Sequence, residues 1–216
     1  MNSYKKPKHM AEIINIPKNQ GTKILFRNRF IERLTRTHIS IPLILLTLYA
    51  MLVLYWGIAR TQVGGISIAG MFLGGMLFWT FFEYIIHRFI WHLDTDTEFK
   101  KKLQYKLHGV HHEYPRDKDR LALPIPLSLT IATLLLILFQ WVFGQYSFGF
   151  FSGFVIGYLL YLSIHYAIHA FQPPKNILKW LWIYHGMHHY KTEDHYYGVS
   201  SPIWDLVFRT VPEKKK

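Results

Sequence analysis

Histidines dominate the residues of this sequence that could do chemistry. Ten of the thirteen fall into four short clusters, which are His87 and His92; His108, His111 and His112; His165 and His169; and His185, His188 and His189. Imidazole is a common ligand for first-row transition metals. A single histidine in a core or at a membrane interface is usually only a polar anchor, but four such clusters are typical of metal and catalytic sites. The clusters therefore predict a metal centre.

The spacing within the clusters favours helices. Offsets of three and four residues place His108, His111 and His112 on one helical face, and the fourth cluster repeats this pattern. His165 and His169 are four apart. His87 and His92 are five apart and would diverge by about 140° on a helix of 3.6 residues per turn. We therefore expect unwinding or a bend between these two, or ligation of different metals.

The number of histidines predicts two metals. A first-row ion accepts at most about six ligands and a tetrahedral zinc four, so ten imidazoles would overfill one site. Two ions with about five imidazoles each would leave a position for oxygen or water. The sequence has no cysteine, which excludes thiolate ligands and disulfides but does not identify a compartment.

Glu83 precedes His87 by one helical turn. Its carboxylate could accept the free N–H of that imidazole and so fix the tautomer of the ring. The alternative is an interfacial glutamate paired with Arg88. The sequence leaves both interpretations open.

The histidine clusters lie beside long stretches of sequence that contain no charged residue. No Asp, Glu, Lys or Arg occurs in residues 41–59, 61–82 or 121–174. About 20 apolar residues suffice for a helix to cross a bilayer, and a soluble protein does not need runs this long. Because Gly144 to Ser147 offers a turn inside the last block, we expect four spans, at about 41–59, 65–86, 123–143 and 148–170. The predicted fold is an all-α integral membrane protein of two hairpins.

The basic residues predict the orientation. Of the 25 Lys and Arg residues, only Arg60 falls in the two loops on one side, and the remaining 24 fall in the segments on the other. Positive charge stays on the cytoplasmic side, so both termini and the central loop should be cytoplasmic. All four histidine clusters then meet in a cytoplasmic helical cap. The net charge of +12 fits an anionic leaflet without nucleic-acid binding.

The first 40 residues lack the apolar core of a signal peptide. Within this basic cytoplasmic segment, residues 22–37 mix apolar and cationic side chains, which predicts a helix on the membrane surface.

Residues 83–210 resemble the integral-membrane fatty acid hydroxylase and sterol desaturase superfamily, most closely its fatty acid 2-hydroxylase branch. The resemblance rests on four motifs in order, EYIIHRFIWH, HGVHHEYPRDKDRLALPIP, HYAIH and HGMHHYKTEDHYYGVSSPIWDLVFRT. It implies that residues 41–216 form one membrane-bound hydroxylase domain with a di-iron centre that activates O2. It also implies that the ten clustered histidines are the ligands and that Tyr161 lies near the metals, which makes Tyr161 and Glu83 candidate catalytic residues.

Two features depart from the family. Leu162 stands where the hydroxylases often carry Asp after the tyrosine. Some members also carry an N-terminal cytochrome b5 domain, for which 40 residues leave no room. We therefore expect an external electron donor of the cytochrome b5, ferredoxin or reductase type.

The leading hypothesis is hydroxylation of a membrane lipid or fatty acyl chain, in a bacterial inner membrane or the endoplasmic reticulum. A desaturase, or a sterol or carotenoid oxidase, could use the same histidines. A metal transporter is a further alternative, but it would place polar residues deep inside the spans, whereas here the histidines gather at one end.

Overall fold

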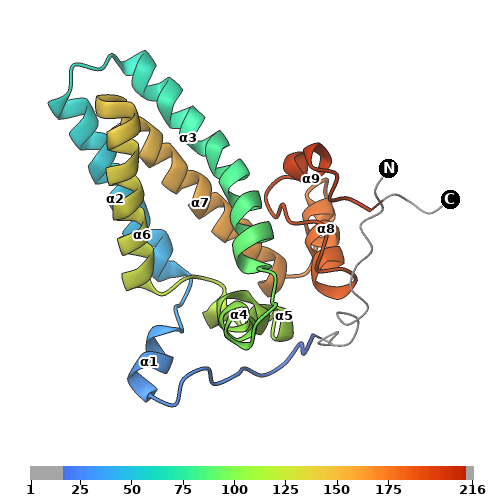
Figure 1. Cartoon of the computed structure of the whole chain (residues 1–216). Coiled ribbons are helices and arrows are strands. Elements are labelled where there is room, and N and C mark those ends of the chain that lie inside the picture. The colour runs from blue at the N-terminus through green and yellow to red at the C-terminus, as the bar shows by residue number, and fades with distance from the viewer. Residues whose placement is uncertain (1–16, 213–216) are drawn as a thin grey trace.

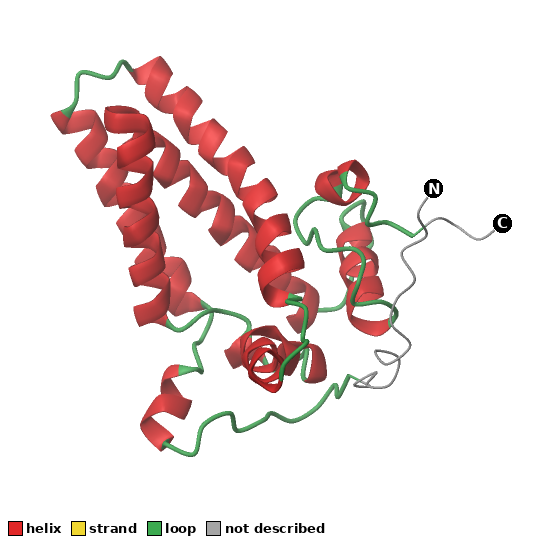
Figure 2. Cartoon of the chain, in the orientation of Figure 1, coloured by secondary structure: helices red, strands yellow, loops and turns green. Residues whose placement is uncertain are grey.

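Four long helices build the body of the molecule. A computed structural model describes residues 17–212, and this part of the chain is helical without strands (Figures 1 and 2). The long helices are α2 (Ser40–Arg60), α3 (Gly65–Ile86), α6 (Ile125–Phe143) and α7 (Ser147–Ala170). Their bounds lie within two residues of the four predicted apolar segments, because uninterrupted apolar sequence without proline in its interior favours helix over that whole length.

Three segments are long and apolar enough to cross a membrane, namely Ser40–Arg60, Gly65–Trp91 and Lys118–Ala170. The third contains both α6 and α7, which are joined by the short 3₁₀ helix η4 (Gly144–Tyr146). Gly144 has a φ of +54°, a conformation that glycine adopts without steric cost. The chain reverses at the predicted turn, and α6 and α7 lie side by side (Figure 1).

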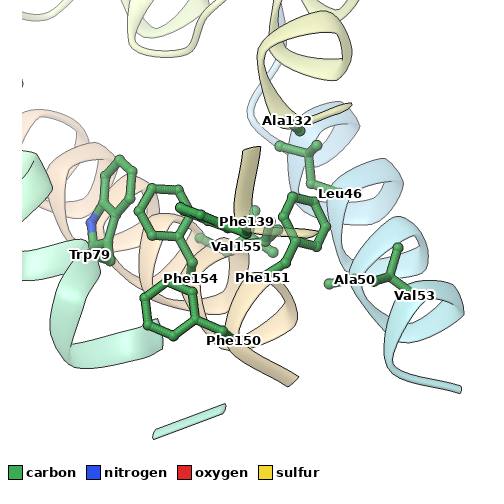
Figure 3. Close-up of a cluster of buried hydrophobic side chains, with 11 residues drawn as sticks. Leu46, Ala50, Val53, Trp79, Ala132, Phe139, Phe150, Phe151, Phe154 and Val155 are labelled. Carbon is green, nitrogen blue, oxygen red and sulfur yellow. The ribbon is translucent and has the colours of Figure 1, made fainter. Parts of the chain in front are cut away.

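Aromatic and aliphatic side chains from all four helices fill the space between them (Figure 3). Phe151 and Phe154 of α7 lie at the centre of this core. The outward faces are also apolar, with exposed residues such as Leu52, Leu77 and Trp141. Apolar surface on this scale marks contact with lipid or another apolar partner, so the body is that of a membrane protein.

Helices α3 and α7 approach each other backbone to backbone. A Cβ at Gly75 would lie 2.0 Å from the carbonyl oxygen of Phe150, and a Cβ at Gly153 would lie 1.8 Å from that of Phe72. Small residues permit such contact between helices in a membrane. By contrast, a Cβ at Gly70, which lies on α3 with Gly75, would meet no described atom within 4 Å. The close approach fixes the relative position of two helices that carry histidines at their ends.

Most of the remaining elements form a cap around the C-terminal ends of α3 and α7 (Figure 1). The cap contains two π-helices, η1 (His87–Trp91) and η2 (Tyr105–Gly109), and a short 3₁₀ turn, η3 (Lys118–Arg120). Its α-helices are α4 (Glu98–Gln104), α5 (Val110–Glu113), α8 (Lys179–Tyr190) and α9 (Ile203–Val207). The histidine clusters lie where this cap meets the four-helix body.

The N-terminal segment differs from its prediction. The expected helix over residues 22–37 is reduced to α1 (Arg29–Leu34), which begins where the Asn28 side chain accepts hydrogen bonds from Phe30 and Ile31. Upstream of α1 the chain crosses the cap: the Lys18 backbone N–H donates to Glu113 at 2.7 Å, and Arg120 donates to the Lys23 carbonyl at 2.7 Å. These long-range contacts outweigh helix propensity here. Residues 1–16 of the predicted basic segment lie outside the described residues.

Candidate metal centre

The ten predicted histidines come together as two groups of five. We call them the first group (His87, His92, His108, His112 and His188) and the second group (His111, His165, His169, His185 and His189). Within each group, one ring nitrogen from every histidine lies within 4.8 Å of the others. His92 is partly exposed and the other nine are buried. Rings from distant parts of the chain thus converge at two neighbouring points.

Each HxxHH motif contributes to both groups. His108 and His112 belong to the first group and His111 to the second. The fourth cluster reverses this assignment, since His185 and His189 belong to the second group and His188 to the first. The predicted single face is therefore split. At 100° per residue, positions i and i+4 are about 40° apart, whereas positions i+3 and i+4 are about 100° apart, so the middle histidine points to the neighbouring group.

A π-helix aligns His87 with His92. The His92 backbone N–H donates to the His87 carbonyl at 3.1 Å, the i to i+5 bond that defines a π-turn. The two rings lie 5.2 Å apart between centroids and belong to the same group. The predicted unwinding between them is confirmed, and the geometry does not support the alternative of different metals.

The spacing between ring nitrogens fits metal coordination. In the first group, the Nε2 atoms of His87 and His108, His108 and His112, and His92 and His188 are 3.2, 3.1 and 3.0 Å apart. The four separations in the second group range from 2.9 to 3.1 Å. Two imidazoles bound at right angles to one ion at about 2.1 Å would hold their nitrogens about 3.0 Å apart. Both groups therefore match adjacent ligands of a first-row metal.

Hydrogen bonds fix the tautomer of two rings. Nδ1 of His87 donates to the Tyr197 carbonyl at 2.5 Å, and Nδ1 of His188 donates to the His195 carbonyl at 2.7 Å. A carbonyl only accepts, so Nδ1 carries the proton and Nε2 of each neutral ring presents a lone pair. Lone pairs that face one another do not stabilise the fold unless a cation lies between them.

Burial disfavours protonation of the clustered histidines in the cap. Burial, reinforced by neighbouring imidazoles, holds the pKa well below its usual value for His108, His111, His112, His185, His188 and His189. Burial likewise lowers the pKa of His92 to about 2. A histidine must be unprotonated to bind a metal, so these rings are ready to act as ligands at pH 7.

Glu83 does neither of the two things that its sequence context predicts. Its carboxylate accepts hydrogen bonds from the backbone N–H groups of Val199 at 2.7 Å and Ser200 at 3.0 Å, and from the Ser200 hydroxyl. The partner of His87 is the Tyr197 carbonyl, and Arg88 donates to the Tyr84 hydroxyl at 2.8 Å. Both interpretations of Glu83 were wrong because the true partners lie more than a hundred residues away.

Tyr161 lies against the second group. Its ring stacks on His165 with centroids 5.6 Å apart and planes 12° apart. Leu162, which replaces the Asp of the family pattern, is buried beside it. Both residues line the same internal cavity.

This cavity has a volume of about 530 Å³ and runs between the helices to both groups. His87 and His108 of the first group and His111 and His165 of the second form part of its wall. The rest is mainly apolar, with contributions from α2, α3, α6 and α7, including Leu46, Trp79, Ala132, Phe151, Phe154 and Val155. The volume is typical of a ligand pocket. The sequence did not reveal it, because these residues look like ordinary core.

Comparison with known proteins defines the class. Residues 72–210, well over half of the chain, match the model of the fatty acid hydroxylase family, and the chain belongs to this family. It is 34% identical over 200 residues to a dihydroceramide fatty acyl 2-hydroxylase from Arabidopsis thaliana, which covers 88% of this chain and 80% of the plant protein.

Other relatives are longer. The fatty acid 2-hydroxylase of Mus musculus is 39% identical over 67% of this chain and 40% of its own length. The ceramide very long chain fatty acid hydroxylase scs7 of Schizosaccharomyces pombe is 36% identical over 89% of this chain and 56% of its own length. The solved structure of full-length scs7p, in which only the hydroxylase domain is visible, superposes with a TM-score of 0.80 at 29% identity, covering 88% of this chain and 72% of that one.

These findings confirm the predicted relationship to the 2-hydroxylase branch. The chain is an enzyme of the hydroxylase class of oxidoreductases, and the predicted reaction type, hydroxylation of a lipid acyl chain, agrees with its family.

Proposed function

We propose that this protein is a di-iron monooxygenase that hydroxylates carbon 2 of a lipid acyl chain, with electrons supplied by a separate protein. One observation carries the proposal: an apolar cavity of about 530 Å³ ends at both histidine groups. An acyl chain dissolved in the bilayer could enter such a cavity without crossing water. The named activities of the relatives support attack at carbon 2.

The donor set suits two ions. Five imidazoles per group leave one position of an octahedral ion free for oxygen or water. Imidazole also binds zinc and copper, so the choice of iron rests on the family. When bound, the iron pair would supply the activation of O2. In the overall reaction a C–H bond becomes C–OH, and the second oxygen atom leaves as water, with two electrons from the donor and two protons from solvent.

The protein's own residues would hold the substrate in place. Attack at carbon 2 requires the head group to stay beside the histidine groups, because carbon 2 is bonded to the carbonyl carbon. The polar wall residues Thr35, Lys106 and Arg120 could contact this head group. The tail would extend along Ala132, Phe151 and Val155 between α2, α6 and α7, where apolar walls exclude water.

The proposed topology has four spans in two hairpins, with both termini and the metal centre in the cytoplasm. It is supported by the position of His87, His165 and His169 at the same ends of α3 and α7 (Figure 1) and by the bias of Lys and Arg toward that side. The membrane would be a bacterial inner membrane or the endoplasmic reticulum. Exposed Lys101, Lys102 and Lys106 on the cap would favour docking of an acidic cytochrome b5, ferredoxin or reductase.

The test is expression in a host without 2-hydroxylated lipids, followed by mass spectrometry of total acyl chains. The wild type should add one oxygen to acyl species, and fragmentation should place it on carbon 2. The His111→Ala variant should lose the product. His38→Ala is the matched control, because His38 contacts Ser40 at the start of α2 and belongs to neither group. Loss of two hydrogens would instead indicate a desaturase, and full activity in His111→Ala would refute the proposal.

A further inference from the structure

The loop of residues 195–200, between α8 and α9, connects to the first group through its backbone. The His195 carbonyl accepts the hydrogen bond from His188 of α8 at 2.7 Å, and the Tyr197 carbonyl accepts the one from His87 of η1 at 2.5 Å. The two histidines are 101 residues apart in the chain. One short loop therefore sets the ring orientation of ligands from two separate elements.

Two buried carboxylates hold this loop. Asp205 accepts from the N–H of Tyr197 at 2.9 Å and of Gly198 at 2.7 Å, and Glu83 accepts from the N–H of Val199 and Ser200. Four successive backbone donors thus point at carboxylates. Asp205 is fully buried, and Glu83 is 4% exposed. Hydrogen bonds in a buried, paired network are geometrically specific, so the carbonyls of the loop are held in a defined direction.

Space around the loop is also fully used. A Cβ at Gly198 would lie 2.0 Å from the Ser201 carbonyl oxygen and 2.9 Å from Oδ2 of Asp205. The Thr210 hydroxyl donates at 2.6 Å to Oδ1 of Asp205, the oxygen that also accepts from the Tyr197 N–H. The loop is therefore held by contacts other than those to the histidines.

The second group has nothing comparable. Within residues 17–212, the Nδ1 atoms of His111, His165, His185 and His189 are buried without a hydrogen-bond partner. In the first group this holds for His112, whereas His87 and His188 are bonded to the loop. Their orientation follows from packing on α5, α7 and α8. The two groups are adjacent, with the rings of His112 and His189 stacked 4.3 Å apart, yet only the first is tied to the loop.

From these contacts we propose that Glu83 and Asp205 are positioning residues: acting through loop 195–200, they orient His87 and His188 and so tune the first metal site selectively. This inference deepens the proposed function and rests on it, since it takes the histidine groups as metal sites. Glu83 belongs to neither group. Glu83 would act through the loop, as Asp205 would. The two carboxylates differ in that Glu83 lines the cavity and Asp205 does not.

The test is a set of Co²⁺ titrations on purified full-length protein, followed by metal content per chain and by the visible absorption of the bound ion. His185→Ala isolates the first group, and His188→Ala isolates the second. Asp205→Asn and Glu83→Gln are added to each background. Loss of a partner behind a ligand typically costs about 10- to 100-fold in metal affinity, so both changes should weaken Co²⁺ binding by that factor in the His185→Ala background. In the His188→Ala background they should change it by less than about threefold.

Asp96→Asn is the control for the substitution itself, because Asp96 pairs with Lys100 on the exposed surface at 2.8 Å. Ser200→Ala, which removes only the hydroxyl donor to Glu83, serves if either acidic variant fails to fold. Ser200→Ala should weaken Co²⁺ binding less than the acidic variants do, and again only in the His185→Ala background. Equal weakening of both groups, or no change in either, would overturn the inference while leaving the proposed function intact. Failure of the wild type to bind Co²⁺ at all would overturn both.

Discussion

The two histidine groups each contain five histidines but are built in different ways. The first draws rings from two π-helices and from α5 and α8, and a loop fixes two of them by hydrogen bonds. The second is centred on His165 and His169, one turn apart on the long helix α7, and on the matching pair His185 and His189 of α8. Regular helices and packing alone bring the second group together.

The two groups are held in place by different contacts. Helix α7 is held against α3 by direct backbone contact, so the second group needs little further support. The first group depends on segments that would relax without the loop. Ligands held rigidly before binding lose less entropy when an ion arrives. We therefore expect the second group to fill first and the first group to be the more easily perturbed.

The largest effect should come from removing one ligand from each group. Because loss of even an indirect partner costs about 10- to 100-fold, His188→Ala and His185→Ala should each reduce hydroxylation by more than about 100-fold. Metal analysis should find one ion per chain in each variant. The ion should occupy the second group in His188→Ala and the first group in His185→Ala. Loss of both ions from either variant would show that the two groups do not bind metal independently.

The next effect concerns the frame that both groups share. Gly153→Ala should force α7 away from α3, because the new Cβ would meet the Phe72 carbonyl oxygen at 1.8 Å. Overpacking typically costs about 1–3 kcal/mol, so the midpoint of thermal unfolding in detergent should fall, and both groups should lose metal together. Gly70→Ala is the matched control and should not lower the midpoint, since its Cβ meets no described atom within 4 Å. Selective loss from one group in Gly153→Ala would contradict a shared frame.

A more selective change is Gly198→Ala. The added methyl would displace loop 195–200 and should weaken only the first group, by about 10- to 100-fold in metal affinity. The control is Gly186→Ala. Gly186 lies in α8 between His185 and His188, and a Cβ there would meet no described atom within 4 Å. The control variant should preserve both sites and stabilise the helix by up to about 1 kcal/mol. The measurement is a Co²⁺ titration of the two variants in parallel. If both variants weakened Co²⁺ binding equally, loop 195–200 would have no specific role in holding the first group.

The smallest effect should follow Tyr161→Phe. The ring that stacks on His165 remains and only the hydroxyl is lost, so metal content of both groups should not change. If the hydroxyl only assists substrate orientation, product formation should fall by less than about tenfold, in line with the modest energy of one hydrogen bond. A complete loss of product with full metal content would instead make the Tyr161 hydroxyl part of the chemistry.

The number and type of candidate ligands and the four long helices could be predicted from the sequence. The sequence also indicated two metals, because ten imidazoles exceed the capacity of one ion. The need for distortion between His87 and His92 was visible from their five-residue spacing. These features are local: they depend on composition, on the length of apolar runs and on the period of the helix.

The packing of the helices and loops decides which histidine joins which group, what Glu83 contacts and where the cavity lies. The split of each HxxHH motif depends on the neighbour that each side of the helix meets. Glu83 finds its partners 116 and 117 residues away, and residues 17–28 follow the cap because of contacts to Glu113 and Arg120. Spacing along the chain fixes angles within one helix, whereas partners between elements are set by how the elements pack.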